Sequence, residues 1–181
     1  MNSMNSIARF DNWTQECEIA LNKQINLEYM ASYQYQALYS YFDRDNISMK
    51  NIAAFFLKSC KEERDHGDDL VKYQNIRGGK VVLENITKPI LEFNSDNSKS
   101  DVLIAFELAL QLEQQVYKSL LNLHKIADNS GDHQFSDYIE SNFLEEQIKA
   151  NYELGSIIAQ LRRIGKDGHG LWNFDNNFKK D

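Results

Sequence analysis

Apolar residues recur with helical spacing through four long stretches of this chain, at about 13–42, 48–77, 100–128 and 134–163. The 181 residues include a single Pro and eight Gly, so little interrupts these stretches. Gly78 and Gly79 end the second stretch and Gly165 ends the fourth, as glycine often does at a helix C-terminus. Each stretch therefore predicts an amphipathic helix about 45 Å long.

The connections between these helices predict how they are arranged. The first and third connections, DRDN and NSGDH, are short, so each joins two helices into an antiparallel hairpin. The middle connection, KVVLENITKPILEFNSDNSK, holds the only Pro and a short β-like run, VVLENI. When extended, it is long enough to run back along a helix of about 45 Å.

We therefore expect an all-α fold, a four-helix bundle with one long crossover connection, in a single domain that spans residues 1–181. The tail LWNFDNNFKKD predicts a short fifth helix at about 170–178. Alone it is too short to stay helical, so it should dock on its own bundle or on a neighbouring subunit.

The net charge of −7 and the absence of a Lys/Arg run exclude nucleic acid and an anionic membrane surface as expected partners. No segment has the apolar length of a membrane span. The N-terminal residues MNSMNSIARFDNW lack the features of a secretory or organellar signal. Cys17 and Cys60 form no zinc-type pair and fit a reducing compartment. We therefore expect a cytoplasmic protein.

Polar residues interrupt the apolar stripe of each predicted helix. On the second helix, Glu63 and His66 share a face because they are three residues apart. Glu28 on the first helix, Glu113 on the third and Gln147 on the fourth also fall among apolar residues. Counting from the two hairpin turns puts them within about one helical turn of the same level. We therefore expect the five side chains to meet inside the bundle.

A single buried carboxylate more often reflects a misassigned helix register or a neighbouring hydrogen-bond donor than a ligand site. Three carboxylates at one depth are costly unless a positive charge compensates them, and no Lys or Arg falls on these stripes at that level. A metal ion is the natural compensator. Carboxylates with one imidazole suit iron or manganese, and Glu63 has two oxygens with which to bridge two ions about 3.5 to 4 Å apart.

At these residues the chain resembles ferritin of the eukaryotic heavy-chain type. The stretches that carry the resemblance are QINLEYMASYQY, YFDRD, EERDH, LALQLEQQV, LLNLHKIA and FLEEQIKA, and the likeness covers nearly the whole chain. It implies a ferroxidase centre with two iron ions, in which Glu63 bridges. The other residues that it implies are Glu28 and His66 on one iron, Glu113 on the second, Gln147 and Tyr35 beside them, and Glu62 as an accessory carboxylate that passes iron onward.

The resemblance also implies a hollow homo-oligomeric shell, a 24-mer, formed alone or together with related subunits. Asp137 and Glu140 match the acidic residues that line threefold channels for iron in the family. His124 matches a histidine near these channels, although a lone His is more often structural.

The chain departs from the family patterns in several places. Bacterioferritin has a Glu-x-x-His pair on the fourth helix, where this chain has Gln147 and Ala150, and its haem-binding Met falls at Arg64. Haem is therefore not expected. Lys58 and Lys61 replace residues that are often His. The tail matches the family's fifth helix loosely, which leaves the fourfold pore undetermined.

The resemblance implies an iron-storage subunit with ferroxidase activity, which oxidises Fe²⁺ with O₂ and stores the product as mineral. Two alternatives stay open. One is a catalytically silent storage subunit of the light-chain kind, which the complete ligand set disfavours. The other is an unrelated four-helix interaction module whose buried Glu residues are hydrogen-bonded without metal.

Overall fold

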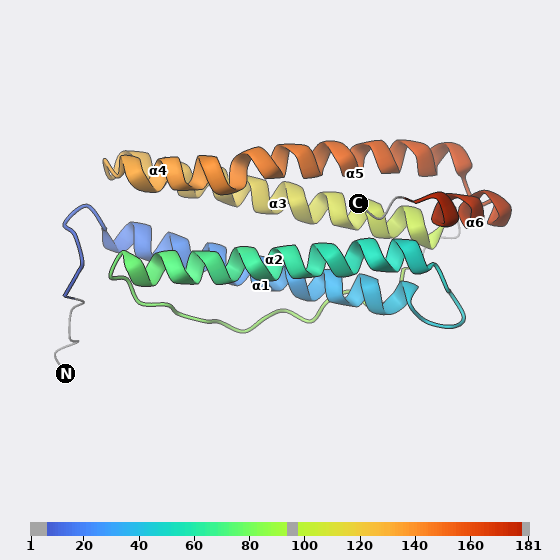
Figure 1. Cartoon of the computed structure of the whole chain (residues 1–181), viewed down its shortest axis with the longest axis horizontal. Coiled ribbons are helices and arrows are strands. Elements are labelled where there is room, and N and C mark those ends of the chain that lie inside the picture. Colours follow the sequence, from blue (N-terminus) through green and yellow to red (C-terminus); the bar gives the residue numbers. More distant parts are fainter. Residues whose placement is uncertain (1–6, 94–97, 179–181) are drawn as a thin grey trace.

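The computed structural model describes residues 7–93 and 98–178, and over these ranges it contains helices and no strand. Figure 1 shows two long helical hairpins packed on each other, with an extended connection along the outside of the first. The all-α prediction, a four-helix bundle with a long crossover and a short C-terminal helix, is confirmed. The elements are α1 (Gln15–Phe42), α2 (Lys50–Ile76), α3 (Asp101–Asn129), α4 (His133–Ile139), η1 (Glu140–Leu144), α5 (Glu145–Ile164) and α6 (Gly168–Asn177).

The fourth long stretch of the sequence is divided into three elements. A five-residue π-helix, η1, separates α4 from α5. A π-helix is wider than an α-helix and occurs often near functional sites. The apolar pattern predicts a single helix over these residues. It does not reveal the π-helix, because the backbone keeps helical dihedral angles throughout, as at Ile139 and Glu145.

The crossover holds no strand in the described residues 78–93, although the run VVLENI has β-like composition. Its backbone bonds to amide side chains of α1 instead. Asn22 accepts from the Val82 N–H at 3.0 Å and donates to the Lys80 carbonyl at 2.9 Å. Gln34 binds both the N–H and the carbonyl of Ile90. These amides therefore take the role that a neighbouring strand would have in a sheet.

A buried ion pair joins the two hairpins at the end of the bundle where α2 stops. The Arg77 guanidinium binds Asp132, which is fully buried and whose carboxylate also caps α4 by accepting from the Phe135 N–H. Arg77 also donates to the Tyr73 hydroxyl at 2.7 Å and lies over the Trp13 ring. The partners satisfy both charges, as a buried pair requires.

The short helix α6 docks on its own bundle, at the end near the turn between α1 and α2 (Figure 1). Oδ1 of Asp175 accepts from the N–H groups of Asn51 (3.1 Å) and Ile52 (2.9 Å) in the first turn of α2. The N-cap residue of α2, Met49, offers no side-chain cap, so Asp175 supplies it from α6. Phe178 packs edge-on against Phe55.

None of the helices in the ranges that the structure describes is long and apolar enough to cross a membrane.

Candidate metal centre

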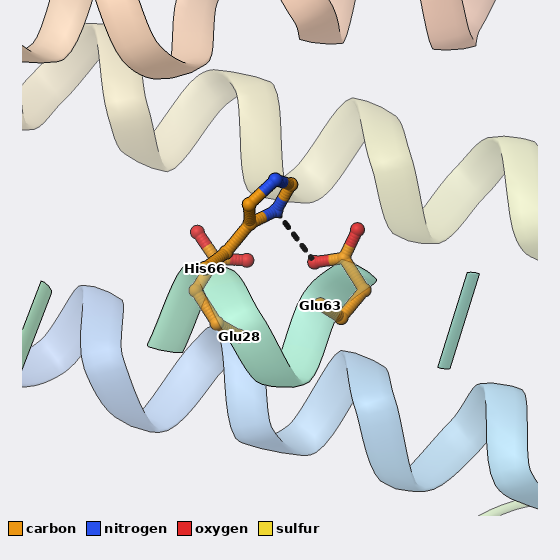
Figure 2. A group of neighbouring side chains, drawn as sticks. All are labelled: Glu28, Glu63 and His66. Carbon is orange, nitrogen blue, oxygen red and sulfur yellow. Dashed lines mark ion pairs between the residues drawn. The ribbon is translucent and has the colours of Figure 1, made fainter. Parts of the chain in front are cut away.

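Three potential metal ligands from α1 and α2 converge in the interior of the bundle. Each of Glu28, Glu63 and His66 offers one ligand atom, and these atoms all lie within 4.8 Å of one another. Figure 2 shows the two carboxylates and the imidazole gathered in the space between the helix pairs. Glu28 is 0% exposed and Glu63 is 4% exposed. The apolar stripes place them there, because Leu21, Ile25 and Ala31 bury the same face of α1 as Glu28.

The carboxylates of Glu28 and Glu63 are poorly satisfied by the protein itself. Oε2 of each is buried and receives no hydrogen bond from the described residues, apart from a proton that the two carboxyls can share. Buried polar atoms normally have a partner. The residues therefore fit a bound cation, which would use both oxygens.

Electrostatics also indicate a missing positive charge. Burial raises the pKa of Glu28 well above its usual range, and the neighbouring Glu63 carboxylate adds to the rise. Burial likewise raises the pKa of Glu63 to about 8, with a further contribution from the charge of Glu113. Desolvation and like charge both disfavour the ionised form, and a divalent cation reverses both effects.

Glu113, from α3, is held differently. Its Oε1 accepts a hydrogen bond from the buried Tyr35 hydroxyl of α1, and its Oε2 accepts from Nε2 of Gln147 of α5 at 2.7 Å. Burial still raises the pKa of Glu113, although both donors oppose the rise. The two hydrogen bonds fix the carboxylate, so Glu113 is oriented before any ion arrives.

A cavity of about 570 Å³ lies along the site. It is bounded by side chains of α2, α3 and α5 together with Tyr35 of α1, and its lining includes Glu63, His66, Glu113 and Gln147. Glu62, predicted as an accessory carboxylate, also lines it, with its carboxylate 3.8 Å from Lys58. The structure thus brings together Glu28, Tyr35, Glu62, Glu63, His66, Glu113 and Gln147.

Two residues that contact the site were not identified from the sequence. Gln24 is fully buried and donates to Oε1 of Glu28 at 2.7 Å, and its spacing of four residues on the same stripe is a signal that could have revealed it. Glu146 lies with Oε2 3.4 Å from Nε2 of His66. It is exposed, and a search for polar residues on buried stripes therefore passes over it.

Asp137 and Glu140 do not join this site. Both are exposed on α4 and η1, away from the lining of the cavity. Glu140 pairs with Nε2 of His124 at 2.6 Å, which gives that His a partner within the chain. Their role in an iron channel stays a prediction.

Comparison with known proteins shows the family to which a chain with this fold is related. A ferritin-like domain model of the ferritin family matches residues 18–164. The chain is 50% identical to the chloroplastic ferritin-3 of Glycine max over 94% of this chain and 65% of the relative. It is 52% identical to the chloroplastic ferritin of Malus baccata var. xiaojinensis over 94% of this chain and 67% of the relative. Against the chloroplastic ferritin-4 of Arabidopsis thaliana the identity is 50%, over 94% of this chain and 64% of the relative.

These relatives are chloroplast proteins by name, so the expectation of a cytoplasmic location is wrong. Two unpaired thiols fit any reducing compartment, and they therefore cannot separate the cytosol from a plastid. The family is settled by the matched domain, by identities near one half and by the bundle itself. The chain belongs to the ferritin family.

Proposed function

We propose that this protein is an iron-storage subunit with ferroxidase activity of the heavy-chain kind. The observation that carries the proposal is the buried group Glu28, Glu63 and His66, in which two carboxylate oxygens have no hydrogen-bond donor among the described residues apart from a proton that the two carboxyls can share. A silent storage subunit has no need to keep such costly groups inside its core. The substrate is Fe²⁺, and the oxidant is O₂.

In this proposal two Fe²⁺ ions bind side by side. Glu28 and His66 bind the first, Glu113 binds the second, and Glu63 bridges them. Hard carboxylate oxygens favour Fe³⁺ over Fe²⁺, which makes loss of an electron easier. The two ions give up one electron each, and O₂ takes up these two electrons and two protons to leave as H₂O₂. Tyr35 and Gln147 act on this reaction by orienting Glu113.

The raised pKa values of Glu28 and Glu63 give the metal-free site a second property. Burial raises the pKa of both carboxyls, and the Glu63 carboxyl, with a pKa of about 8, holds a proton near neutral pH and releases it when a cation binds. A proton for the reduction of O₂ is therefore available at the site. Glu62 and Glu146 line the same cavity and offer carboxylates to which the Fe³⁺ product can move.

The proposal extends to assembly and transport. The subunits form a hollow 24-mer, with Asp137 and Glu140 lining channels that concentrate Fe²⁺, and the whole chain acts as one domain. The plastid is the location that the names of the plant relatives favour. Size-exclusion chromatography tests the shell directly, since a free subunit of 21.1 kDa contradicts it.

The double variant Glu63→Lys/His66→Gly tests the activity. It should assemble as the unmodified protein does and lose rapid Fe²⁺ oxidation, measured by O₂ uptake in the first seconds after Fe²⁺ is added. Glu145→Lys/His169→Gly is the matched control, because it makes the same exchanges at exposed positions outside the cavity. Initial uptake at the unmodified rate in the first variant would refute the site. No uptake by the unmodified protein would make it a silent storage subunit.

A further inference from the structure

Both ends of the Gln147 side-chain amide are engaged. Nε2 donates to Oε2 of Glu113 at 2.7 Å, towards the metal centre. On the other side, Nδ2 of Asn151 lies 3.3 Å from Oε1 of Gln147 and 2.8 Å from the Gln147 backbone carbonyl. Asn151 is one turn further along α5 and is half-buried. It is absent from the lining of the cavity.

The contact decides which way the Gln147 amide faces. A primary amide has a donor end and an acceptor end of nearly the same shape, so its orientation follows from its partners. Nδ2 of Asn151 can only donate, and it meets an oxygen. The nitrogen of Gln147 must then face Glu113, where it donates to Oε2.

We propose that Asn151 is a positioning residue that holds Gln147 as a hydrogen-bond donor to Glu113. The ion-binding consequence rests on the ferroxidase function proposed above. In this arrangement Oε1 of Gln147 faces Asn151 and not Glu113, so Gln147 supports the second ion through Glu113. A substitution of Asn151 should therefore change the binding of the ion at Glu113 and not the binding of the ion at Glu28 and His66.

Two substitutions remove the donor. Asn151→Asp keeps the shape and replaces the N–H₂ by an oxygen, which repels Oε1 of Gln147. Asn151→Leu keeps the size and removes the polar group. Asn177→Asp is the matched control, because Nδ2 of Asn177 makes the same pair of bonds to Asn173, to its carbonyl at 2.8 Å and to its side-chain oxygen at 3.0 Å. Asn177 is exposed on α6 and lies outside the metal cavity.

Neutron diffraction from metal-free, deuterated crystals tests the orientation without any metal. The unmodified protein should show two deuterons on the Gln147 atom that faces Glu113. In Asn151→Asp the amide should be rotated, with its oxygen towards Glu113, whereas Asn177→Asp leaves it as it was. An oxygen facing Glu113 in the unmodified protein, or an amide that keeps its orientation in Asn151→Asp, overturns the proposal.

Titration with Co²⁺, followed by its visible absorption, tests the effect on ion binding. Asn151→Leu should lower the affinity for the second equivalent of Co²⁺ by about threefold to tenfold, since loss of a supporting hydrogen bond lowers metal affinity. The affinity for the first equivalent should stay unchanged. In a Gln147→Leu background the same substitution should change the second equivalent by less than about twofold, because sites that act in series are not additive. If Asn151→Leu lowers the affinity for both Co²⁺ equivalents equally, Asn151 is not a positioning residue for Glu113. The same conclusion follows if Asn151→Leu has its full effect in the Gln147→Leu background.

The two experiments separate this inference from the proposed function. If the unmodified protein binds no pair of Co²⁺ ions, the metal centre is refuted, and the neutron map still decides whether Asn151 orients Gln147.

Discussion

Nδ1 of His66 lies 3.8 Å from Oε2 of Glu63, one helical turn earlier on α2. This separation is too long for a hydrogen bond. Bonds of about 2.1 Å from one metal ion to a nitrogen and to an oxygen span such a gap. The pair is therefore spaced for a shared cation, and the buried Glu63 oxygen has no other partner among residues 7–93 and 98–178 apart from the neighbouring carboxyl.

The metal-free protein should lose stability as pH rises from about 5 to 8. The folded-state pKa of Glu63 is about 8, above the ordinary value of 4.5, so the folded state binds more protons than the unfolded state in this window. Stability then falls with rising pH, by at most about 1.4 kcal/mol per pH unit for one group. Denaturant unfolding at several pH values measures the slope.

Glu63→Gln should reduce this slope, because an amide does not titrate. Excess Co²⁺ or Fe²⁺ without O₂ should reverse the trend, since metal binding needs ionised carboxylates. A slope that is the same in Glu63→Gln would mean that other groups set the pH dependence.

Tyr35→Phe should destabilise the metal-free protein by about 1–3 kcal/mol, because it leaves Oε1 of the buried Glu113 without its donor. Tyr41→Phe is the control, since the buried Tyr41 donates at 3.1 Å to Asp101, which is only half-buried, so that water can replace the hydroxyl at its carboxylate. Urea unfolding compares the two. Equal losses of unfolding free energy would show that the hydrogen bond from Tyr35 to Glu113 stabilises the protein no more than the bond from Tyr41 to Asp101 does.

Asp175→Ala should release α6 from the bundle, because it removes the acceptor for two N–H groups at the start of α2. Loss of a helix cap costs about 1–2 kcal/mol. Trypsin should then cut faster at the exposed Lys166, between α5 and α6. Asn176→Ala, at an exposed position of the same helix, should leave the cleavage rate unchanged. If both variants are cut equally, docking of α6 does not depend on the Asp175 carboxylate.

Arg77→Met should cost about 3–5 kcal/mol, since it leaves the fully buried Asp132 carboxylate without its cation. Lys72→Met, which breaks an exposed pair with Asp69, should change the free energy of unfolding very little. Thermal unfolding of the two variants checks the difference. A small loss of unfolding free energy in Arg77→Met would mean that the Arg77–Asp132 ion pair contributes little to stability.

The periodicity of the sequence predicts the bundle because buried helices need continuous apolar stripes. The same stripes, interrupted by Glu28, Glu63 and Glu113, place these residues in the core, and counting from the turns gives their common level. Gln24 lies four residues before Glu28 on the same stripe, a signal that the search did not use. The contacts of Glu146 and Asn151 escape this reasoning, because they depend on side-chain rotamers and on helix packing. No residue type marks the π-helix at 140–144 either. The cellular location leaves no trace in the helical pattern, and that expectation was wrong.

The most direct test of the metal centre is anomalous diffraction above and below the iron absorption edge, from crystals soaked with Fe²⁺. We predict two peaks about 3.5 to 4 Å apart, one in contact with Glu28, Glu63 and His66 and the other with Glu63 and Glu113. Iron peaks confined to exposed carboxylates such as Asp137, with none between these side chains, would contradict the account.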